Sequence, residues 1–509
     1  MKESQQNALK EFEEFQRQAF QEYEDFRRQA NEEYANFMEK AWKMFDAHPA
    51  EEPPLKPKPT IPMVDDTPAP TPEPEPTPTP TPEPEPEIEP DPDPEPTPEP
   101  EPEQPSPTRP TIDPVRIPDP VVLPELSNPT PTPPERPKPM EPIKPSAVPM
   151  LAAQKVFLYG SSFPFHLESE DQLKLVDASE KSVAKMWKQL SDPSFDIVIA
   201  ECLQQRESRN LCDWAYIKLT QQVAEKQFGA GTNEAVVMQM YLLTQSGYQA
   251  RIGRDNDDNL ALLVGSNERL FYYKYFILDN VRFYILDKRF NQKGLSIFDH
   301  AFPKEKSLSM AMMQPELDEA KTEKRTIKSK RYPDVSITVQ TNRNLIDFYN
   351  DYPITTKWEN YSKASLSKVM KTTLYPALRQ AIEGKTEREA ANILLNFVQT
   401  GFEYQTDDQQ FGYERPLFPD ETFFYPYCDC EDRSILYSCL VRELLGLEVV
   451  LLDYPSHIAT AVCFNEPVTG DYFVMDGKNY IICDPTYINA DVGECAPKYK
   501  TISPKVVRF

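Results

Sequence analysis

The sequence lacks the features that mark membrane, secreted and nucleic-acid-binding proteins. No run of 18 or more apolar residues occurs, which argues against a membrane-spanning helix. The first residues, MKESQQNALKEFEEFQ, hold no hydrophobic stretch that could act as a signal sequence, so we expect a cytoplasmic protein, with export by another route left open. Acidic residues outnumber basic ones by 81 to 55, and no basic stripe stands out, which argues against a nucleic-acid partner.

Disulfides are not expected either. The eight cysteines stand mostly in apolar surroundings and show no spacing typical of a secreted scaffold, so we expect mainly reduced thiols. Histidine is scarce, with four residues in the chain and only His457 after His300. A Cys–His pair in the C-terminal region therefore has one candidate base.

Proline and charge are unevenly distributed. Residues 49–149 hold 39 of the 54 prolines, with 21 acidic and 7 basic side chains, and no glycine precedes Gly160. Such a segment lacks the apolar side chains that offset the entropy of folding, and its prolines remove backbone donors. We therefore expect a disordered linker over 49–149 that acts as a stiff polyproline II spacer. A PxxP ligand is the alternative role of this linker.

An eleven-residue repeat of two aromatic residues and an alanine occupies the N-terminal 48 residues. Spacings of three and four residues put ten side chains on one stripe of a helix that Pro49 ends: Phe12, Phe15, Ala19, Tyr23, Phe26, Ala30, Tyr34, Phe37, Ala41 and Phe45. This period favours a nearly straight or slightly right-handed supercoil. The stripe in residues 12–45 needs a cover, and three readings remain: self-association into a bundle, docking onto another protein, or packing on the globular part of this chain.

The C-terminal region carries the candidate chemistry. Apolar residues recur at helical spacing over 435–444, and Gly446 stands where a left-handed cap would end the helix. Cys430 then lies at the helix N-terminus, where backbone N–H groups stabilise a thiolate. Glu431 and Asp432 in the first turn oppose that charge, so the thiol needs a basic partner.

The strands predicted after this helix present two further groups. EVVLLDY and HIATAVCF are typical of strands, with His457 at the start of the second. DYFVMDGKNYIICDPTY is typical of a hairpin that turns at Asp476 and Gly477 and ends at Asp484. Cys, His and Asp at the ends of regular elements are the components of a thiol hydrolase, in which the imidazole takes the thiol proton and the carboxylate orients the ring. A CxC metal site is disfavoured, because no second thiol pair or histidine cluster completes it.

These residues resemble the pattern of the transglutaminase-like superfamily, whose papain-type core has a cysteine at a helix N-terminus followed by histidine and aspartate on successive strands. His457 lies 27 residues from both Cys430 and Asp484. The remaining matches are Asp432 after the cysteine, residues 442–446 at the helix end with one extra residue, and the Asp-Pro-Thr triplet at 484–486. The resemblance covers about residues 380–490 and implies a Cys430–His457–Asp484 triad.

The sequence departs from that family at Cys428, where the family has glycine two residues before the nucleophile. The thiol of Cys428 would alter the oxyanion site or act as a redox partner of Cys430. For the oxyanion we expect the backbone N–H of Cys430, with Tyr425 or Tyr427 as a side-chain donor. No metal and no organic cofactor is implied.

A second copy of the pattern, without its catalytic groups, lies upstream. Residues 276–287 align without a gap on residues 473–484. With Gly247 and Gly446 as anchors, the positions of Cys430 and His457 fall on Gly231 and on Asp258, beside Asn259, and Asp484 pairs with Asp287. Unless the likeness is chance, this predicts a catalytically dead first copy that binds substrate or supports the second. Its aromatic residues line a recognition surface or, as we favour, its core: Trp214, Tyr216, Phe271, Tyr272, Tyr273 and Tyr275.

Together these patterns predict an α+β protein of four parts. They are a helix over 1–48, a disordered linker over 49–149, a degenerate transglutaminase-like domain with a basic, solvated connector over 150–345, and a catalytic transglutaminase-like domain over 346–509. The predicted activity is hydrolysis of an amide in a protein or peptide, with acyl transfer second. The alternative is a scaffold: an inactive papain-like pair that only binds, displayed by the helix and linker.

Overall fold

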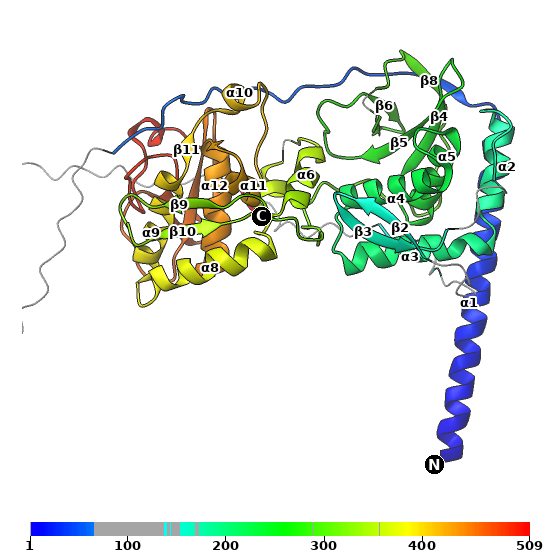
Figure 1. Cartoon of the computed structure of the whole chain (residues 1–509), viewed down its shortest axis with the longest axis horizontal. Helices are drawn as coiled ribbons and strands as arrows, with labels where there is room; N and C mark the ends of the chain where they lie inside the picture. The colour runs from blue at the N-terminus through cyan, green and yellow to red at the C-terminus, as the bar shows by residue number, and fades with distance from the viewer. Residues whose placement is uncertain are drawn as a thin grey trace, which may run out of the picture.

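The computed structural model describes residues 2–65, 137–139, 143, 153–167, 173–287, 289–355 and 357–509. Within these residues the chain mixes helices and strands around two separate antiparallel sheets, one in each half of the molecule (Figure 1). Across the same residues, no helix is both long and apolar enough to span a bilayer. The mixed content of helix and strand and the long N-terminal helix are confirmed, whereas residues 66–136 of the predicted linker lie outside the described residues.

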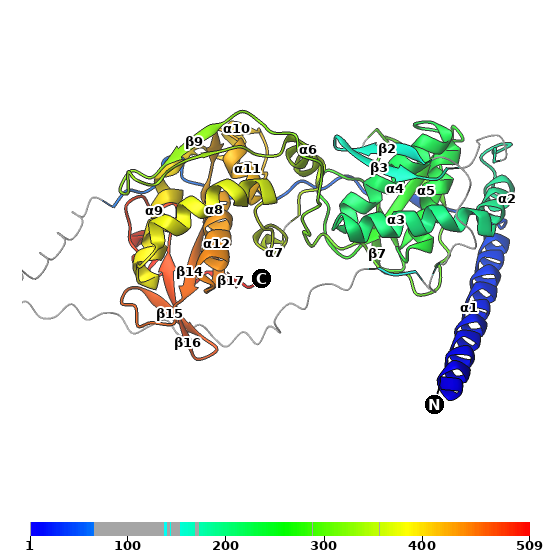
Figure 2. The same cartoon turned by 60° about the horizontal axis from the view of Figure 1, so that its bottom comes forward.

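The N-terminal helix α1 (Lys2–Met38) is shorter than the sequence predicts and projects from the first half (Figures 1 and 2). The chain turns after Met38 and continues as strand β1 (Lys43–Asp46), so Phe45 belongs to a strand and does not open a fourth helical repeat. Tyr34 is 2% exposed in the core of the first half, whereas Phe15 is 70% exposed. Packing on the globular part therefore holds for the C-terminal end of α1, and self-association or docking stays a prediction for its exposed part.

The first half is built on a six-stranded antiparallel sheet of order β1-β8-β4-β5-β7-β6. Its strands are β4 (Ala250–Arg254), β5 (Leu260–Ser266), β6 (Tyr275–Leu278), β7 (Val281–Ile285), β8 (Gly294–Phe298) and β1 at the edge. A separate hairpin, β2 (Gln154–Leu158) and β3 (Ser161–Phe165), precedes the helices α2 (Glu180–Leu190), α3 (Asp196–Ser208), α4 (Asp213–Phe228) and α5 (Asn233–Gln245).

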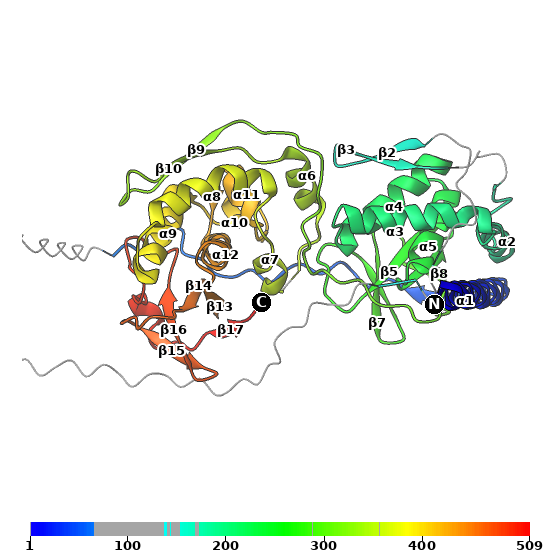
Figure 3. The same ribbon diagram turned by 90° about the horizontal axis from the view of Figure 1, so that it is seen from below.

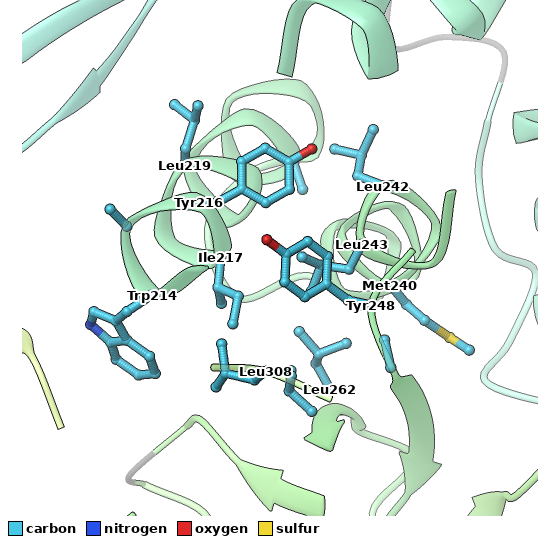
Figure 4. Close-up of a cluster of buried hydrophobic side chains, with 14 of the residues drawn as sticks. Trp214, Tyr216, Ile217, Leu219, Met240, Leu242, Leu243, Tyr248, Leu262 and Leu308 are labelled. Carbon is cyan, nitrogen blue, oxygen red and sulfur yellow. The ribbon is translucent and has the colours of Figure 1, made fainter. Parts of the chain in front are cut away.

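Most of the aromatic residues that the sequence marks in this half are buried. Trp214 and Tyr216 of α4 are fully buried, and the ring of Tyr216 stacks on that of Tyr248 with centroids 5.6 Å apart (Figure 4). The hydroxyl of Tyr248 donates a 2.8 Å hydrogen bond to Asp213, and those of Tyr216 and Ser246 share one of 2.6 Å. The preferred core reading is therefore confirmed for these residues, and also for Phe271, Tyr273 and Tyr275.

The second half is built on a five-stranded antiparallel sheet of order β15-β16-β14-β13-β17. Its strands are β13 (Glu448–Tyr454), β14 (His457–Cys463), β15 (Tyr472–Met475), β16 (Lys478–Cys483) and β17 (Lys505–Val507). Helix α12 (Cys430–Leu440) lies between this sheet and helix α9 (Glu387–Gly401) (Figures 2 and 3). Further elements complete this half: α7 (Trp358–Ser362), α8 (Lys368–Ile382), β11 (Glu403–Tyr404), α10 (Asp407–Gln410), α11 (Pro419–Phe424) and β12 (Tyr427–Cys428).

The two sheets share one strand order. In each half a helix ends near a left-handed glycine, Gly247 after α5 and Gly446 after the π-helical extension (Val441–Leu445) of α12, and leads into an antiparallel pair and then a hairpin. The hairpins turn at Asp279–Asn280 and Asp476–Gly477, whose φ angles are all positive, as a type I′ turn requires. The predicted hairpins are confirmed, and the common topology supports a duplicated unit to which β1 adds an edge strand.

The boundary predicted between residues 345 and 346 falls inside helix α6 (Arg343–Asp351). The basic stretch before it, predicted as a solvated connector, contains strand β9 (Arg325–Lys328), which pairs with β10 (Ser336–Val339). Ile327 is buried against the second half, and Arg325 donates a 3.1 Å hydrogen bond to the carbonyl of Phe423. Most of this stretch is exposed or half-buried, but Ile327 and Ser329 are buried, because the apolar face of the hairpin packs on the second half.

The predicted linker begins as a docked segment, not as a free spacer. Residues 51–65, called the strap below, run from the first sheet to the second half and pass α10 (Figure 1). At its start, the carbonyl of Glu51 accepts a 2.9 Å hydrogen bond from the N–H of Tyr272. At its end, the N–H of Asp65 donates a 2.7 Å hydrogen bond to the carbonyl of Ile488.

The prediction of a disordered linker over 49–149 is therefore wrong for the strap. Proline disrupts the backbone hydrogen bonds of helices and sheets, which is why the sequence suggests disorder. An extended proline-rich segment can still dock through its side chains and its remaining backbone groups. Pro137 is docked as well, since its carbonyl accepts a 3.0 Å hydrogen bond from Arg206.

Candidate active site

Helix α12 places Cys430 at its first position. The helix begins there because the backbone N–H of Asp429 donates a 3.1 Å hydrogen bond to Oδ2 of Asp432, as in a capping box. Oδ1 of Asp432 accepts a second bond of 2.8 Å from the N–H of Leu417. Cys430 is 1% exposed, so the predicted nucleophile lies at a buried helix N-terminus.

Strands β14 and β16 bring the other two predicted residues together. His457 is the first residue of β14, and Asp484 directly follows β16, which pairs with β14. Nε2 of His457 lies 2.8 Å from Oδ2 of Asp484. The other oxygen of this carboxylate, Oδ1, accepts backbone hydrogen bonds from Thr486 at 2.9 Å and from Tyr487 at 3.2 Å. The carboxylate is thus held in one orientation, with Oδ2 toward the imidazole.

The second ring nitrogen of His457 is available for proton transfer. Nδ1 is buried and has no hydrogen-bond partner among the described residues. The ring stacks on Tyr499, with centroids 4.8 Å apart and an angle of 11° between the planes. When Nε2 donates its hydrogen to Asp484, the lone pair stands on Nδ1, which is the form that a general base needs.

Cys430 and His457 lie on contacting elements but are not hydrogen-bonded to each other. One turn into α12, the hydroxyl of Ser434 donates a 3.0 Å hydrogen bond to the carbonyl of Ile458, the residue after His457. Sγ of Cys430 donates to Oε2 of Glu431 at 3.0 Å. The structure therefore sets the first turn of α12 against the start of β14 and leaves the thiol turned toward a carboxylate.

This environment keeps Cys430 as a thiol. Burial raises the pKa of Cys430, and the charges of Glu431 and Asp429 raise it further, whereas Lys58 lowers it. The sequence predicts that acidic residues in the first helical turn disfavour the thiolate, and Glu431 does so. Asp429, which precedes the helix, strengthens this effect.

Five buried acidic side chains surround this end of α12 and are called the acidic cluster below: Asp407, Glu414, Asp429, Glu431 and Asp432. Burial and then the charge of Glu431 raise the pKa of Glu414 and that of Asp432 to about 7. Burial also raises the pKa of Asp407 and that of Asp429. Against the effect of burial, Lys58 lowers the pKa of Glu431 to about 2, so Glu431 carries the most persistent negative charge of the cluster.

The counter-charge comes from the strap. Nζ of Lys58 lies 2.9 Å from Oδ2 of Asp429, 2.9 Å from Oε1 of Glu414 and 3.6 Å from Oδ2 of Asp407, and it also pairs with Oε1 of Glu431. The Lys58 side chain is 3% exposed. No sequence pattern marked Lys58, because it stands in a proline-rich stretch far from Cys430 along the chain.

Divalent cations also prefer carboxylate oxygens as ligands. Carboxylate oxygens of Asp407, Glu414 and Glu431 lie within 4.8 Å of one another, as do those of Asp407, Asp429 and Asp432. The Lys58 ammonium stands among them and supplies positive charge at this position. The acidic cluster thus accommodates the ammonium group of a lysine side chain.

The two tyrosines predicted as oxyanion donors have different surroundings. The hydroxyl of Tyr425 donates a 2.7 Å hydrogen bond to Asn350, and Tyr427 is 39% exposed. Tyr404, which no pattern marked, pairs with Cys428 between β11 and β12, and its buried hydroxyl has no hydrogen-bond partner within the described part of the chain. Burial raises the pKa of Tyr404, and the Cys430 charge raises it further, so an unused O–H group lies near the nucleophile.

Cys428 is buried, and its Sγ lies 3.9 Å from the carbonyl oxygen of Glu403. All eight cysteines are free, which agrees with the prediction of reduced thiols. Redox pairing of Cys428 with Cys430 stays a prediction.

Two buried residues that the motifs did not include support the site. Nε2 of Gln399 donates to the carbonyls of Asp484, Tyr487 and Ala490 at 3.1, 2.8 and 3.0 Å. Arg433 of α12 donates to the carbonyl of Gln399 at 3.1 Å. Together they join α9 to α12 and to the loop that carries Asp484. A long polar residue such as Gln399 among the apolar positions of a helix indicates a buried hydrogen bond, but it does not identify the partner of that bond.

The corresponding end of the first sheet has asparagine at the positions of Cys430 and His457. Helix α5 begins at Asn233, and extending the β5–β7 pairing by one residue puts Asn259 at the position of His457. Asn233 replaces the predicted counterpart Gly231, because the π-helical extension of α12 shifts the count back from the glycine anchor. Asn259 replaces Asp258, because the turn between β4 and β5 holds one residue more than the turn between β13 and β14. Asp287 pairs with Arg289 at 2.8 Å. Asn233, Asn259 and Asp287 line a cavity of about 590 Å³.

No protein-family model matches this chain, and neither curated proteins nor solved structures give a significant match.

Proposed function

We propose that the second half is a thiol-dependent amide hydrolase of the transglutaminase-like type that acts on a protein or peptide. The observation that carries this proposal is the pair of His457 and Asp484, 2.8 Å apart, whose imidazole keeps a buried Nδ1 without a partner among the described residues. Supporting it, the strand that begins with His457 packs on the helix that begins with Cys430. The order and spacing of the three residues match the family pattern.

The reaction begins when the thiol turns from Glu431 to Nδ1 of His457. His457 takes the proton while Sγ of Cys430 attacks the carbonyl carbon, so a carbon–sulfur bond forms and an electron pair moves to the carbonyl oxygen. The imidazolium, stabilised by Asp484, then gives its proton to the amide nitrogen, and the carbon–nitrogen bond breaks to release an amine. A water molecule, deprotonated by His457, then attacks the thioester carbon. A carbon–oxygen bond forms, the carbon–sulfur bond breaks to release the carboxylic acid, and the imidazolium returns the proton to the thiolate.

Two donors can stabilise the oxyanion. The backbone N–H of Cys430 lies at the start of α12, where it has no partner within the helix. The Tyr404 hydroxyl is the side-chain donor that the geometry favours over Tyr425 and Tyr427. Each donor of this kind contributes a factor of about 10² to 10³ in rate.

A second candidate function is binding without catalysis. It is favoured by one observation, the hydrogen bond from the Cys430 thiol to Glu431 among carboxylates that raise its pKa. In that case the second half holds a peptide, and α1 and the strap serve assembly. Acyl transfer to an amine is the variant of the catalytic proposal, since it shares every step up to the thioester.

Alkylation of thiols separates these functions. The native chain is treated with iodoacetamide at neutral pH, and labelled cysteines are mapped by mass spectrometry. We expect Cys430 to react faster than the equally buried Cys439, and the His457→Ala variant to lose this advantage. Labelling of Cys430 no faster than that of Cys439 contradicts the catalytic proposal.

Digestion of an unbiased peptide library then identifies the reaction. New amino termini without amine incorporation indicate hydrolysis, and incorporation of an added amine indicates transfer. Cys430→Ser is the inactive variant, and Cys463→Ser, at a partly exposed thiol of β14, is the matched control that keeps activity. Products that persist in Cys430→Ser contradict the assignment of the nucleophile.

A further inference from the structure

The strap presents its two lysines to the second half, whereas Leu55, Ile61 and Val64 are exposed. Lys56 and Lys58 are two residues apart, which puts both on one side of an extended segment. Nζ of Lys56 lies 2.5 Å from Asp453 and 4.8 Å from the ring centroid of Trp358, while Leu55 is 71% exposed. The strap is thus held by its lysine heads, in the way that a bound peptide is held by side chains in pockets.

The pocket around Lys58 is built for a primary ammonium group. An ammonium has three N–H donors, and three carboxylates lie in direct contact with Nζ, those of Asp429, Glu414 and Glu431. Asp407, at 3.6 Å, adds a fourth acidic group. Every acidic side chain involved is buried, so the charge of the occupant is recognised in a medium where ion pairs are strong.

One oxygen of this pocket remains unused. Asp429 is 0% exposed, and its Oδ1 has no hydrogen-bond partner in the part of the chain that the structure describes. A buried carboxylate oxygen without a donor is costly. Lys58 therefore occupies the pocket without satisfying all of its acceptors.

Glu431 connects the pocket to the nucleophile. Its Oε1 pairs with Lys58, and its Oε2 accepts the hydrogen of the Cys430 thiol at 3.0 Å. A lysine in this pocket therefore lies beside the reacting sulfur with one carboxylate between them. The position is that of a substrate side chain flanking the bond to be cut.

We propose that the acidic cluster is a subsite for the side chain of a lysine in an extended peptide, and that Lys58 of the strap occupies it in the resting protein. The proposal rests on the proposed function, whose substrate class it names: peptides with a lysine near the scissile amide. The strap then acts as an internal competitor, and substrate must displace it.

The subsite reads the lysine as a cation and does not use it as a nucleophile. Although burial lowers it, the charges of Glu431, Asp429 and Asp407 raise the pKa of Lys58 far above its ordinary value. An amine kept protonated has no lone pair with which to attack a thioester. Water therefore remains the acceptor in the reaction that this subsite serves.

Protection of Cys430 from alkylation tests the subsite. In the full chain carrying Lys58→Ala, iodoacetamide labelling of Cys430 is measured with and without acetyl-PLKPKPT-amide, the sequence of residues 54–60. We expect Lys58→Ala to speed labelling about tenfold or more, because uncovering the thiol outweighs the loss of the Lys58 charge that lowers the pKa of Cys430, and we expect the peptide to reverse this. A peptide with norleucine in place of Lys58 should need an about tenfold higher concentration to give the same protection, because it lacks the charged ammonium group. Norleucine in place of Lys56 is the matched control and should protect within a few-fold of the native peptide.

Chemical rescue keeps the test decisive if Lys58→Ala folds poorly. n-Propylammonium matches the part of the side chain that the substitution removes, and it should raise the unfolding temperature of Lys58→Ala but not that of Lys56→Ala. Tetramethylammonium at the same ionic strength, which has no N–H donor, should not. Equal effects of the two cations, or equal protection by the lysine and norleucine peptides, overturn the subsite.

Failure of the subsite and failure of catalysis give different results. If the lysine peptide protects Cys430 but no library peptide is cut, the subsite stands and the hydrolase fails. If peptides are cut with no preference for lysine, and lysine and norleucine peptides protect equally, the hydrolase stands and the subsite is overturned.

Discussion

Nε2 of His457 and Oδ2 of Asp484 lie 2.8 Å apart, while Oδ1 of the same carboxylate accepts the N–H groups of Thr486 and Tyr487. The two oxygens of Asp484 are therefore not equivalent. One is fixed by the backbone, so the other is left to define the tautomer of His457. This division decides what a conservative substitution at Asp484 does.

Asp484→Asn is expected to abolish the base without disturbing the fold. The amide oxygen takes the place of Oδ1, because two backbone donors face it, and the NH₂ group then points at Nε2 of His457. That forces the hydrogen onto Nδ1, which removes the lone pair needed to accept the thiol proton, and the rate should fall by about 10³-fold or more. Peptide cleavage and Cys430 alkylation measure the loss, and an unchanged unfolding temperature separates it from misfolding. A variant with near-native rates contradicts the role of Asp484.

Lys58→Met is expected to destabilise the protein by about 3–5 kcal/mol, because it removes the positive charge from a buried ion cluster and leaves the carboxylates unpaired. Lys56→Met should cost about 1 kcal/mol or less, since its ion pair with Asp453 is partly exposed. Unfolding in denaturant, followed by fluorescence, gives both values. Similar losses for the two variants would show that the strap is held along its length and not at Lys58.

Stability should depend on pH through the acidic cluster. The pKa of Glu414 and that of Asp432 are raised to about 7, so from about pH 4 to 7 the folded protein holds protons that the unfolded chain has released. The contribution of these groups to stability therefore falls as pH rises through that window. Glu431, with its pKa lowered to about 2, acts oppositely, and its contribution is lost as pH falls below about 4.

Glu414→Gln checks this sign. Relative to the native chain, the variant should gain stability as pH rises from 5 to 8, because glutamine has no proton to lose. Unfolding temperatures across that range provide the comparison, with Glu52→Gln on the exposed part of the strap as the control. A difference between variant and native chain that stays constant from pH 5 to 8 refutes the raised pKa.

The two ends of α1 should respond differently to truncation of aromatic side chains. Tyr34→Ala is expected to cost about 3–5 kcal/mol, because its ring packs in the core of the first half between Trp187 and Phe302. Phe15→Ala, at an exposed ring, should change stability by less than about 0.5 kcal/mol. Light scattering then tests assembly: a mass above that of one chain, lowered by Phe15→Ala, supports a bundle. A mass of one chain in both proteins refutes it.

The regular elements of the second half could be predicted because each has a local signal. The helix that starts at Cys430, the strand that starts at His457 and the hairpin that turns at Asp476 and Gly477 follow from periodicity, caps and turn residues. These elements put His457 beside Asp484, as expected. The direction of the Cys430 thiol did not follow, because it depends on Glu431 and on charges that come from elsewhere in the chain.

Lys58 shows that amino-acid composition does not predict the docking of an extended segment. Its surroundings of proline and acid correctly excluded a helix or sheet, but docking needs only side chains that fit a surface formed by distant residues. Asp407, Glu414 and Asp429 become a pocket only in the fold, so nothing near Lys58 announces its partners. Tyr404 and Gln399 were missed for the same reason, since each acts through a contact set by tertiary packing.

The most direct test of the central claim is the rate of Cys430 alkylation with and without His457. Iodoacetamide labelling at neutral pH is followed for the native chain, for Lys58→Met and for each of these with His457→Ala. The account predicts that His457→Ala slows Cys430 labelling by about tenfold or more in both backgrounds and leaves Cys463 unchanged. Cys430 labelling that is independent of His457 in both backgrounds contradicts the catalytic triad.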